Sequence, residues 1–281
     1  MSSVRVRTAL PSEALREALA CLDAGRRVVV ATVLKRRGSA PATPGQKLAL
    51  LAPDEAVGTV GGGALEHAVL DKMRSMLADR GSEPIVVRHE LGASMGMCCG
   101  GAVEVLLEPM QADLQVLVVG AGHVGGALVP LLLGLGFRLT VSDAREAAIG
   151  TRGMDALAGV TALALDHDDP EVADALGRPD CAAVLVMTHD HQLDQEVIEW
   201  ALRRGVAFIG GVGSRAKAAR TRQRLEAKGF TPADIERVRM PLGVAIQART
   251  PGEIAVAIAA ELVQWRAQVF GRGRAVSPEK P

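Results

Sequence analysis

Two adjacent cysteines, Cys98 and Cys99, lie in the segment GASMGMCCGG at residues 92–101 of a chain that has four cysteines in all. A disulfide between neighbours would hold their Cα atoms about 3.8 Å apart, closer than a disulfide prefers. Structural zinc is not indicated either, because it usually takes cysteines in spaced pairs, and Cys21 and Cys181 are isolated. The pair therefore points to sulfur exchange or to binding of a soft metal, with two small residues in a packed turn as the alternative.

A glycine-rich turn offers a second kind of chemistry, the binding of phosphate groups. Gly120, Gly122 and Gly125 form the pattern GxGxxG directly after the apolar run VLVV, and Asp143 closes the next apolar run. In dinucleotide-binding folds the first glycine permits a tight turn, the second lets backbone N–H groups approach a pyrophosphate, and the third lets helix and strand pack closely. The spacing predicts a Rossmann fold in which Asp143 binds ribose hydroxyls, with His123 inside the turn. Such glycines also serve packing alone, so nucleotide binding and a structural role both stay open.

Polar residues follow two further apolar runs, where the carboxyl ends of parallel strands would bring them to one edge of a sheet. After VLVM come His189, Asp190 and His191; the histidines either ligate a metal or line a polar rim, while Asp190 caps the next helix. After AFIG come four residues that would bind an anion through backbone N–H groups and a cationic side chain. The alternative is that the serine of this set only caps a helix. The four residues are Gly211, Gly213, Ser214 and Arg215.

The first half of the chain has a glycine loop of its own. In GTVGGGALE, the residues Gly61, Gly62 and Gly63 lead into a helical pattern, and N–H groups at the positive end of a helix suit an anionic ligand. Glu66 lies in the first turn of that helix, where its carboxylate either orients a ligand or stabilises the helix dipole. Both interpretations stay open.

The elements that must position these residues differ between the two halves of the chain. In the first half, a helix capped by Ser12 and ended by Gly25 precedes short strands separated by Gly and Pro turns, and a second helix spans residues 63–79. The expected strands are residues 27–34, 47–51, 56–60, 85–91 and 102–107. This order predicts a mixed α/β domain over residues 1–112, with the adjacent cysteines between its last two strands.

After a linker, EPMQAD at residues 108–113, the pattern becomes a regular alternation of apolar strands and amphipathic helices. Strands are expected at residues 115–119, 138–142, 161–164, 182–187, 206–209 and 237–239. A final helix starts with a capping box of Thr250 and Glu253 around Pro251, and residues 271–281 are expected to be a disordered tail. The fold class is thus α/β, in which the mixed domain is followed by a doubly wound parallel sheet, a Rossmann-type domain over residues 113–270.

Composition removes several classes of function. The 32 basic and 32 acidic residues cancel, and six aromatic residues leave little surface for stacking on bases, so we expect no nucleic-acid partner. The segment at residues 117–137 is long and apolar enough for a membrane span, but its six glycines instead favour a buried strand followed by a turn and a helix. The first residues lack the apolar core of a signal peptide, so we expect a cytoplasmic protein with no membrane association.

Together, these motifs resemble those of the XdhC family, accessory proteins of xanthine dehydrogenase that bind and hand over the molybdenum cofactor. The resemblance is carried by GSAPATPGQKLAL, GTVGGGALE and LGASMGMCCGG, and further along by GAGHVGGAL, SDAR, HDHQLD, GVGSR, RMPLG and TPGEIAVAIAAEL. It implies a two-domain, usually dimeric protein that binds molybdopterin-type cofactor, protects it while a cysteine desulfurase partner supplies sulfide, and delivers it to xanthine dehydrogenase. Cys98 and Cys99 would then contact the molybdenum or relay sulfur.

The residues and the resemblance together predict a cofactor carrier with no turnover of its own. The alternative is an NAD(P)-dependent oxidoreductase that uses the glycine turn, with His189 and His191 as its acid–base group. The chain has no tyrosine, which excludes a tyrosine general acid but not a histidine one. A third class is a scaffold that joins desulfurase to dehydrogenase without holding the cofactor.

Overall fold

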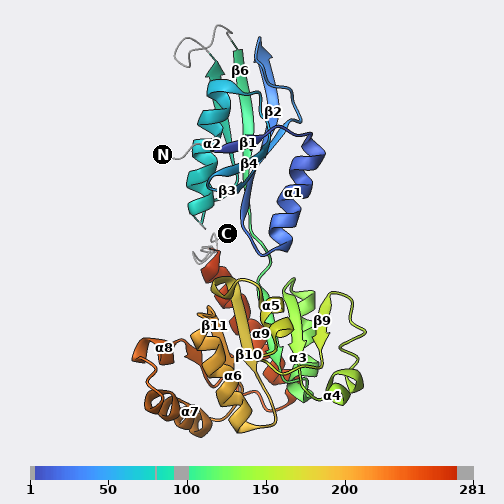
Figure 1. The fold of residues 1–281 in the computed structure, drawn as a ribbon, viewed down its shortest axis with the longest axis vertical. Helices are drawn as coiled ribbons and strands as arrows, with labels where there is room; N and C mark the ends of the chain where they lie inside the picture. Colours follow the sequence, from blue (N-terminus) through green and yellow to red (C-terminus); the bar gives the residue numbers. More distant parts are fainter. Residues whose placement is uncertain (1–3, 80, 92–100, 271–281) are drawn as a thin grey trace, which may run out of the picture. The chain divides into compact units, whose positions relative to one another are not determined.

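The computed structural model describes residues 4–79, 81–91 and 101–270 (Figure 1). They divide into two compact units: the first contains the residues up to Ala112 together with Phe270, and the second runs from Asp113 to Val269. Cys98, Cys99 and the expected tail at residues 271–281 lie outside the described residues. No helix in the described part of the chain is both long enough and apolar enough to cross a membrane. That the two units are domains with separate roles stays a prediction.

The first unit is a six-stranded sheet with a helix on each face. Its helices are α1 (Pro11–Asp23) and α2 (Gly63–Ala78). Its strands are β1 (Arg5–Arg7), β2 (Val28–Gly38), β3 (Lys47–Ala52), β4 (Glu55–Gly58), β5 (Ile85–Leu91) and β6 (Gly101–Met110). They lie in the order β1-β4-β3-β2-β6-β5, and every neighbouring pair is antiparallel except β1 with β4.

The alternation of side chains along β2 explains why this sheet is covered on both faces. Val28 and Val30 belong to the core under α1, whereas Val29, Ala31 and Val33 belong to the core under α2. Because successive side chains of a strand point to opposite faces, an uninterrupted apolar run buries all of its residues only between two layers. Figure 1 shows α1 and α2 on opposite sides of the sheet.

Three features of the first unit differ from the sequence-based prediction. Leu10, not Ser12, is the N-cap residue of α1. Pro11 takes the first helical position, and Glu13 accepts a hydrogen bond from the Leu10 N–H at 3.2 Å. Residues 108–110 pair with β2, so the first half of the predicted linker is strand. The apolar pattern does not reveal β1, because its three residues are all exposed.

The second unit is a parallel sheet of six strands. They are β7 (Gln115–Val119), β8 (Arg138–Ser142), β9 (Val160–Leu163), β10 (Ala182–Val186), β11 (Phe208–Gly211) and β12 (Val238–Arg239). Their order, β12-β11-β10-β7-β8-β9, is that of a doubly wound Rossmann sheet, which confirms the predicted fold class. The order of strands reverses between β7 and β10, which pair directly. Ligands of such sheets bind beyond the carboxyl ends of the strands at this reversal.

Helices cover both faces of the second sheet. On one face, α5 (Pro170–Leu176), α6 (His191–Arg203), α7 (Arg215–Ala227) and α8 (Pro232–Glu236) share a single apolar core. On the other, α3 (His123–Gly134) packs against α9 (Pro251–Val269). There Trp265 of α9 lies against Phe208 of β11, with ring centroids 5.2 Å apart. The short helix α4 (Glu146–Thr151) follows β8.

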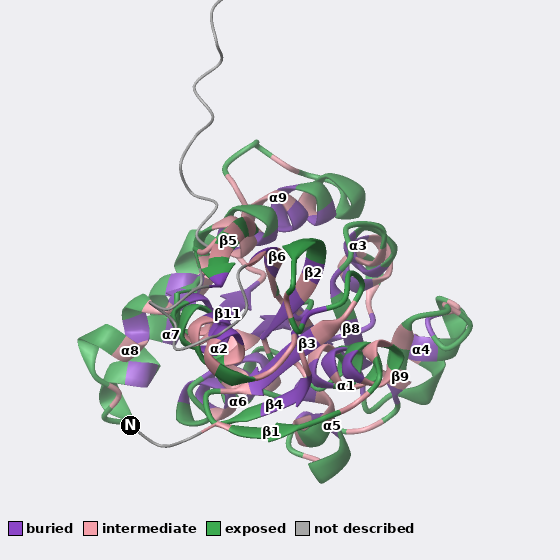
Figure 2. Ribbon diagram, turned by 90° about the horizontal axis from the view of Figure 1, so that it is seen from above, coloured by how far each residue is buried: buried purple, intermediate pink, exposed green. Residues whose placement is uncertain are grey.

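Helix α9 begins as the sequence predicts. The Glu253 carboxylate accepts a hydrogen bond from the Thr250 N–H at 2.9 Å, and the Thr250 hydroxyl accepts one from the Glu253 N–H at 3.3 Å. The predicted apolar face is buried at Ile258, Leu262 and Trp265, and Figure 2 shows buried residues along one side of the helix and exposed residues along the other. The apolar segment at residues 117–137 is likewise a strand, a turn and a helix, as predicted.

Candidate functional site

The turn between β7 and α3 holds three glycines in different environments. Gly120 has a φ of +114°, and a Cβ there would lie 2.5 Å from the Met187 carbonyl oxygen. A Cβ on Gly125 would lie 2.4 Å from the Gly120 carbonyl oxygen. Gly122 is different, because its φ is −73° and a Cβ there would meet no atom within 4 Å. Packing therefore requires glycine at positions 120 and 125, whereas the space beside Gly122 is open to a ligand.

The N-terminus of α3 opens into the same space. No side chain caps this helix, and its first turn contains no acidic residue. The Ala121 N–H, just before the helix, is already bonded to Asp143 at 2.9 Å. Backbone N–H groups at a helix N-terminus carry partial positive charge and bind anions, so the first turn of α3 is suited to a phosphate group.

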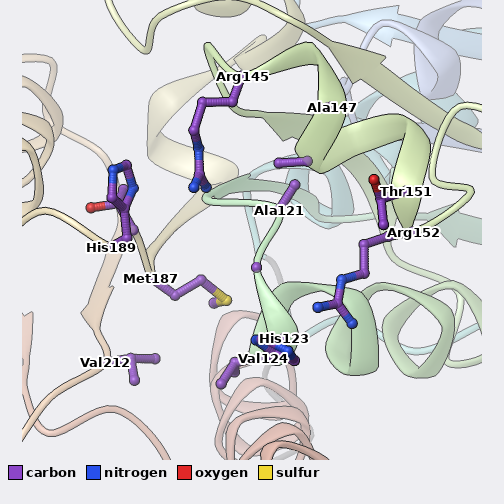
Figure 3. Close-up of a pocket in the computed structure, with 13 residues that line it drawn as sticks. Ala121, His123, Val124, Arg145, Ala147, Thr151, Arg152, Met187, His189 and Val212 are labelled. Atoms are coloured by element: carbon purple, nitrogen blue, oxygen red, sulfur yellow. The ribbon is translucent and has the colours of Figure 1, made fainter.

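A pocket of about 570 Å³ lies over this turn (Figure 3). Its lining comes from the turn after β7, from α4 and its flanking residues after β8, and from the segments after β10 and β11. Four of the lining residues are arginine or histidine: His123, Arg145, Arg152 and His189. No acidic side chain is among the described residues that line it. The pocket is therefore suited to an anionic ligand.

Asp143, predicted to bind ribose, is paired with protein groups. It follows β8 and is 8% exposed. Arg145 Nε donates to its Oδ1 at 2.9 Å, Arg145 Nη2 donates to its Oδ2 at 2.7 Å, and Oδ2 also accepts from the Ala121 N–H. Arg145 lines the pocket and Asp143 does not. Asp143 thus anchors the arginine, and its contact with ribose stays a prediction.

We expect this pair to make stability depend on pH. Burial alone would raise the pKa of the Asp143 carboxyl, but the hydrogen bonds from Arg145 and from the Ala121 N–H outweigh burial and hold this pKa below its usual range. A carboxylate with a lowered folded pKa stabilises the fold above its unfolded pKa, about 3.9, and loses this contribution as pH falls through the folded pKa. Urea unfolding at a series of pH values should show that Asp143→Asn loses less stability below about pH 4 than the wild type. Parallel pH profiles would contradict this assignment.

Arg152 approaches the turn from the side of α4. In Figure 3 its guanidinium group points toward the His123 ring. A Cβ on Gly126 would lie 2.9 Å from Arg152 Cδ, so the arginine crosses the first turn of α3 where there is no side chain. It forms no ion pair with any of the described residues. A cation beside the positive end of a helix is unfavourable by itself, and an anion placed between them would remove the repulsion.

The two histidines after β10 lie in different pockets. His189 lines the pocket over the glycine turn, whereas His191 lines a second pocket, of about 400 Å³, beside α7. Asp190 caps α6 by accepting a hydrogen bond from the Gln192 N–H at 2.7 Å, which is the structural role considered for it. The described residues contain no group of three or more potential metal ligands. The arrangement therefore does not favour a metal site that uses both histidines.

Two of the four residues expected to act after β11 line the second pocket. They are Gly213 and Ser214, and the Ser214 hydroxyl also caps α7 by accepting from the Lys217 N–H at 3.2 Å. Gly211 belongs to β11 and is buried against Met240. Arg215 is exposed and lies outside this pocket. Ligand contact at positions 211 and 215 therefore finds no support in the geometry.

The glycine loop of the first unit has a local structural role. Gly61, Gly62 and Gly63 all have positive φ, at +123°, +77° and +59°. Glu66 accepts a hydrogen bond from the Thr59 hydroxyl at 2.7 Å, and that hydroxyl accepts one from the Gly61 N–H at 3.1 Å. The carboxylate thus fixes the loop before α2. Binding of a ligand by these residues stays a prediction, as it does for the two adjacent cysteines.

Sequence patterns did not single out the two arginines of the first pocket. The sequence could have indicated Arg145 as a site residue, because it follows the predicted ribose-binding residue Asp143 by two positions in the motif SDAR. No sequence pattern indicates Arg152, since it follows a helix of only six residues whose position depends on the fold. Met187 and Thr188, which also line the pocket, directly follow β10 and were therefore near the expected edge.

Comparison with known proteins covers both units. The family described as the XdhC Rossmann domain matches residues 116–262, from β7 into α9. The chain belongs to the XdhC family. A second family description, XdhC and CoxI, matches residues 21–90 in the first unit. The XdhC Rossmann match includes every residue that lines the pocket over the glycine turn.

Three curated relatives are similar to this XdhC-family chain. The uncharacterized protein YqeB of Escherichia coli K12 is 29% identical over 257 residues, which cover 90% of this chain and 46% of that protein. A probable xanthine dehydrogenase subunit of Bacillus subtilis 168 is 29% identical over 163 residues, 58% of this chain and 46% of that protein. The molybdenum cofactor insertion chaperone PaoD of Escherichia coli K12 is 22% identical, over 90% of this chain and 87% of its own. The chain thus spans about half the length of the first two relatives.

Proposed function

We propose that this chain carries the molybdenum cofactor and delivers it to an acceptor enzyme of the xanthine dehydrogenase type. Membership of the XdhC family supports this, as do the names of two relatives, a molybdenum cofactor insertion chaperone and a probable xanthine dehydrogenase subunit. The observation that carries the proposal is the pocket over the glycine turn. There an uncapped helix N-terminus meets Arg145 and Arg152, with no acidic side chain among the described lining residues.

The residues of this pocket fit the chemistry of a molybdopterin. Its phosphate group would lie at the N-terminus of α3 beside Gly122, with Arg152 and Arg145 as cationic partners. Val124, Met187 and Val212 line the same pocket and offer apolar surface to the pterin ring. When bound, the cofactor would supply the molybdenum–sulfur centre, and the contribution of this chain would be to hold the organic part.

The adjacent cysteines, outside the described residues, extend the proposal to the metal. A thiolate is a soft ligand, and either Cys98 or Cys99 would contact molybdenum or relay sulfur. On the family resemblance we further propose that a cysteine desulfurase supplies that sulfur, that the acceptor is xanthine dehydrogenase, and that the carrier works as a homodimer in the cytoplasm.

Retention of the cofactor tests the proposal. The purified protein is mixed with molybdenum cofactor released from a molybdoenzyme and desalted, and bound molybdenum and pterin are measured by mass spectrometry and fluorescence. We expect the wild type to retain both, and Cys98→Ala or Cys99→Ala to retain less molybdenum because a soft ligand is lost. Cys181→Ala is the matched control. No retention by the wild type would overturn the carrier function, and equal molybdenum in all variants would overturn the cysteine role alone.

The alternative function, an NAD(P)-dependent oxidoreductase, draws on the doubly wound sheet and its glycine turn. It predicts saturable binding of NADH or NADPH followed by hydride transfer to a substrate, whereas the carrier binds pterin without turnover. Fluorescence titration with both nicotinamides separates the two. A scaffold, the third class of function, would bind desulfurase and dehydrogenase but would retain neither the molybdenum cofactor nor a nicotinamide nucleotide.

A further inference from the structure

The pocket beside α7 has no role in the proposed function. It measures about 400 Å³ and lies at the same edge of the sheet as the first pocket, since α7 follows β11. The cationic side chains that line it are Lys217, Arg220 and Arg224, together with His191 and the hydroxyl residues Ser214 and Thr221. None of the described residues in its lining is acidic. The lining of this pocket therefore carries an excess of positive charge.

The three cations share one face of α7. Lys217, Arg220 and Arg224 are separated by three and four residues, which is the spacing of side chains that lie one above another on a helix. Like charges at this spacing destabilise a helix. The sequence of α7, RAKAARTRQRLEA, contains a single acidic residue, and its first turn has none. An arrangement that opposes helix stability in this way is typical of a functional surface.

Only one of these cations is neutralised within the described part of the chain. Lys217 Nζ forms an ion pair with Asp194 and also donates to the Val212 carbonyl oxygen at 3.0 Å. The guanidinium groups of Arg220 and Arg224 have no ion pair or hydrogen bond with any described residue. Two full positive charges therefore line the pocket without a counter-charge from any residue that the structure describes.

We propose that this pocket is a second anion site, which binds a phosphate group with at least two negative charges. Guanidinium groups bind phosphate oxygens through paired N–H donors, and two of them on one helix face match a diphosphate or a phosphate monoester better than a singly charged carboxylate. Ser214 and Thr221 add hydroxyl groups to the same lining.

The phosphate has two possible sources. One is a separate small compound, such as a nucleoside diphosphate. The other is the far end of a molecule whose first phosphate lies over the glycine turn, because Val212 lines both pockets. The second source rests on the proposed function, whereas the first does not.

Titration with inorganic pyrophosphate tests the site. Calorimetry at low ionic strength uses full-length Gly122→Val protein as the background, so that the glycine turn does not contribute. We expect binding that Arg220→Gln and Arg224→Gln each weaken about tenfold, the effect of one charge-assisted hydrogen bond. Arg215→Gln removes the same charge from the same helix but outside the pocket, and should change affinity less than about twofold. All four proteins should have the same circular dichroism spectrum.

Two results would overturn the proposal: no pyrophosphate binding to this background, or an equal loss from Arg215→Gln, since equal loss would mean diffuse attraction by a basic helix. The source is identified by repeating the cofactor retention assay with Arg220→Gln and Arg224→Gln in the wild-type background. Weaker retention would assign the pocket to the far end of the cofactor, and unchanged retention would assign it to a separate phosphate compound. Failure of the wild type to retain cofactor would remove the proposed function and leave the pyrophosphate result standing.

Discussion

Replacement of Asp194 by alanine is expected to lower the free energy of unfolding by about 3–5 kcal/mol, the effect of breaking a buried ion pair from one side. Asp194 is 3% exposed. Its Oδ1 accepts hydrogen bonds from the Thr188 N–H at 3.0 Å and from the Thr188 hydroxyl at 2.7 Å, and its Oδ2 pairs with Lys217. Alanine would leave the partly buried Lys217 ammonium group without its counter-charge and the Thr188 N–H without a partner, and such groups are costly to bury.

A matched double variant separates the ion pair from the rest of this network. Urea unfolding of Asp194→Ala, Lys217→Met and the double variant gives a double-mutant cycle. We expect the double variant to be more stable than Asp194→Ala alone, because it no longer contains a partly buried ammonium group without a counter-charge. If the two single losses simply add, Asp194 and Lys217 do not interact as described. The effect should reach both pockets, since Thr188 lines the first and Lys217 the second.

Gly122→Val is expected to weaken retention of the molybdenum cofactor by at least about 100-fold, the equivalent of two charge-assisted hydrogen bonds. The valine side chain would occupy the open space beside the N-terminus of α3, where the phosphate is proposed to lie. The fold should tolerate it, because Gly122 has an ordinary φ of −73°. We expect the free energy of unfolding to fall by only about 1 kcal/mol, the typical cost of replacing a favourable helix N-cap residue.

Gly120→Val provides the contrast. This residue has φ +114° and its missing Cβ would lie 2.5 Å from a carbonyl oxygen, so the variant should lose stability as well as binding. Thermal unfolding and cofactor retention are measured on both variants. A Gly122→Val protein that keeps full retention would show that the glycine turn does not hold the phosphate.

The sequence predicted the Rossmann sheet well because its central strands are short apolar runs between clear turn signals. The bounds of β7 and β8 agree with the predicted residues 115–119 and 138–142. It was less accurate where long-range contacts decide the boundary. The strand predicted at residues 206–209 begins at Phe208, because the Val206 N–H bonds back to the Ala201 carbonyl oxygen and finishes α6. No local pattern distinguishes such a helix end from a strand start.

The site was predictable only where one short segment determines it. Gly122, His123 and His189 were expected near the carboxyl edge of the sheet, and they line one pocket there. The separation of His189 from His191, and the ion pair between Asp194 and Lys217, depend on how distant segments pack. Spacing in the sequence does not encode those distances.

In the first pocket, the Asp143 carboxylate competes with any anionic ligand for the guanidinium group of Arg145. A phosphate that engages Arg145 shares the guanidinium group with a carboxylate that already takes up two of its five N–H donors and repels the anion. The carboxylate charge beside Arg145 therefore reduces the affinity for an anion, and a lower affinity shortens the residence time. Because the pKa of Asp143 lies below its usual range, this competitor stays ionised at neutral pH. Such a pocket favours rapid exchange of an anion over tight storage, which is the property that the proposed delivery of a cofactor requires.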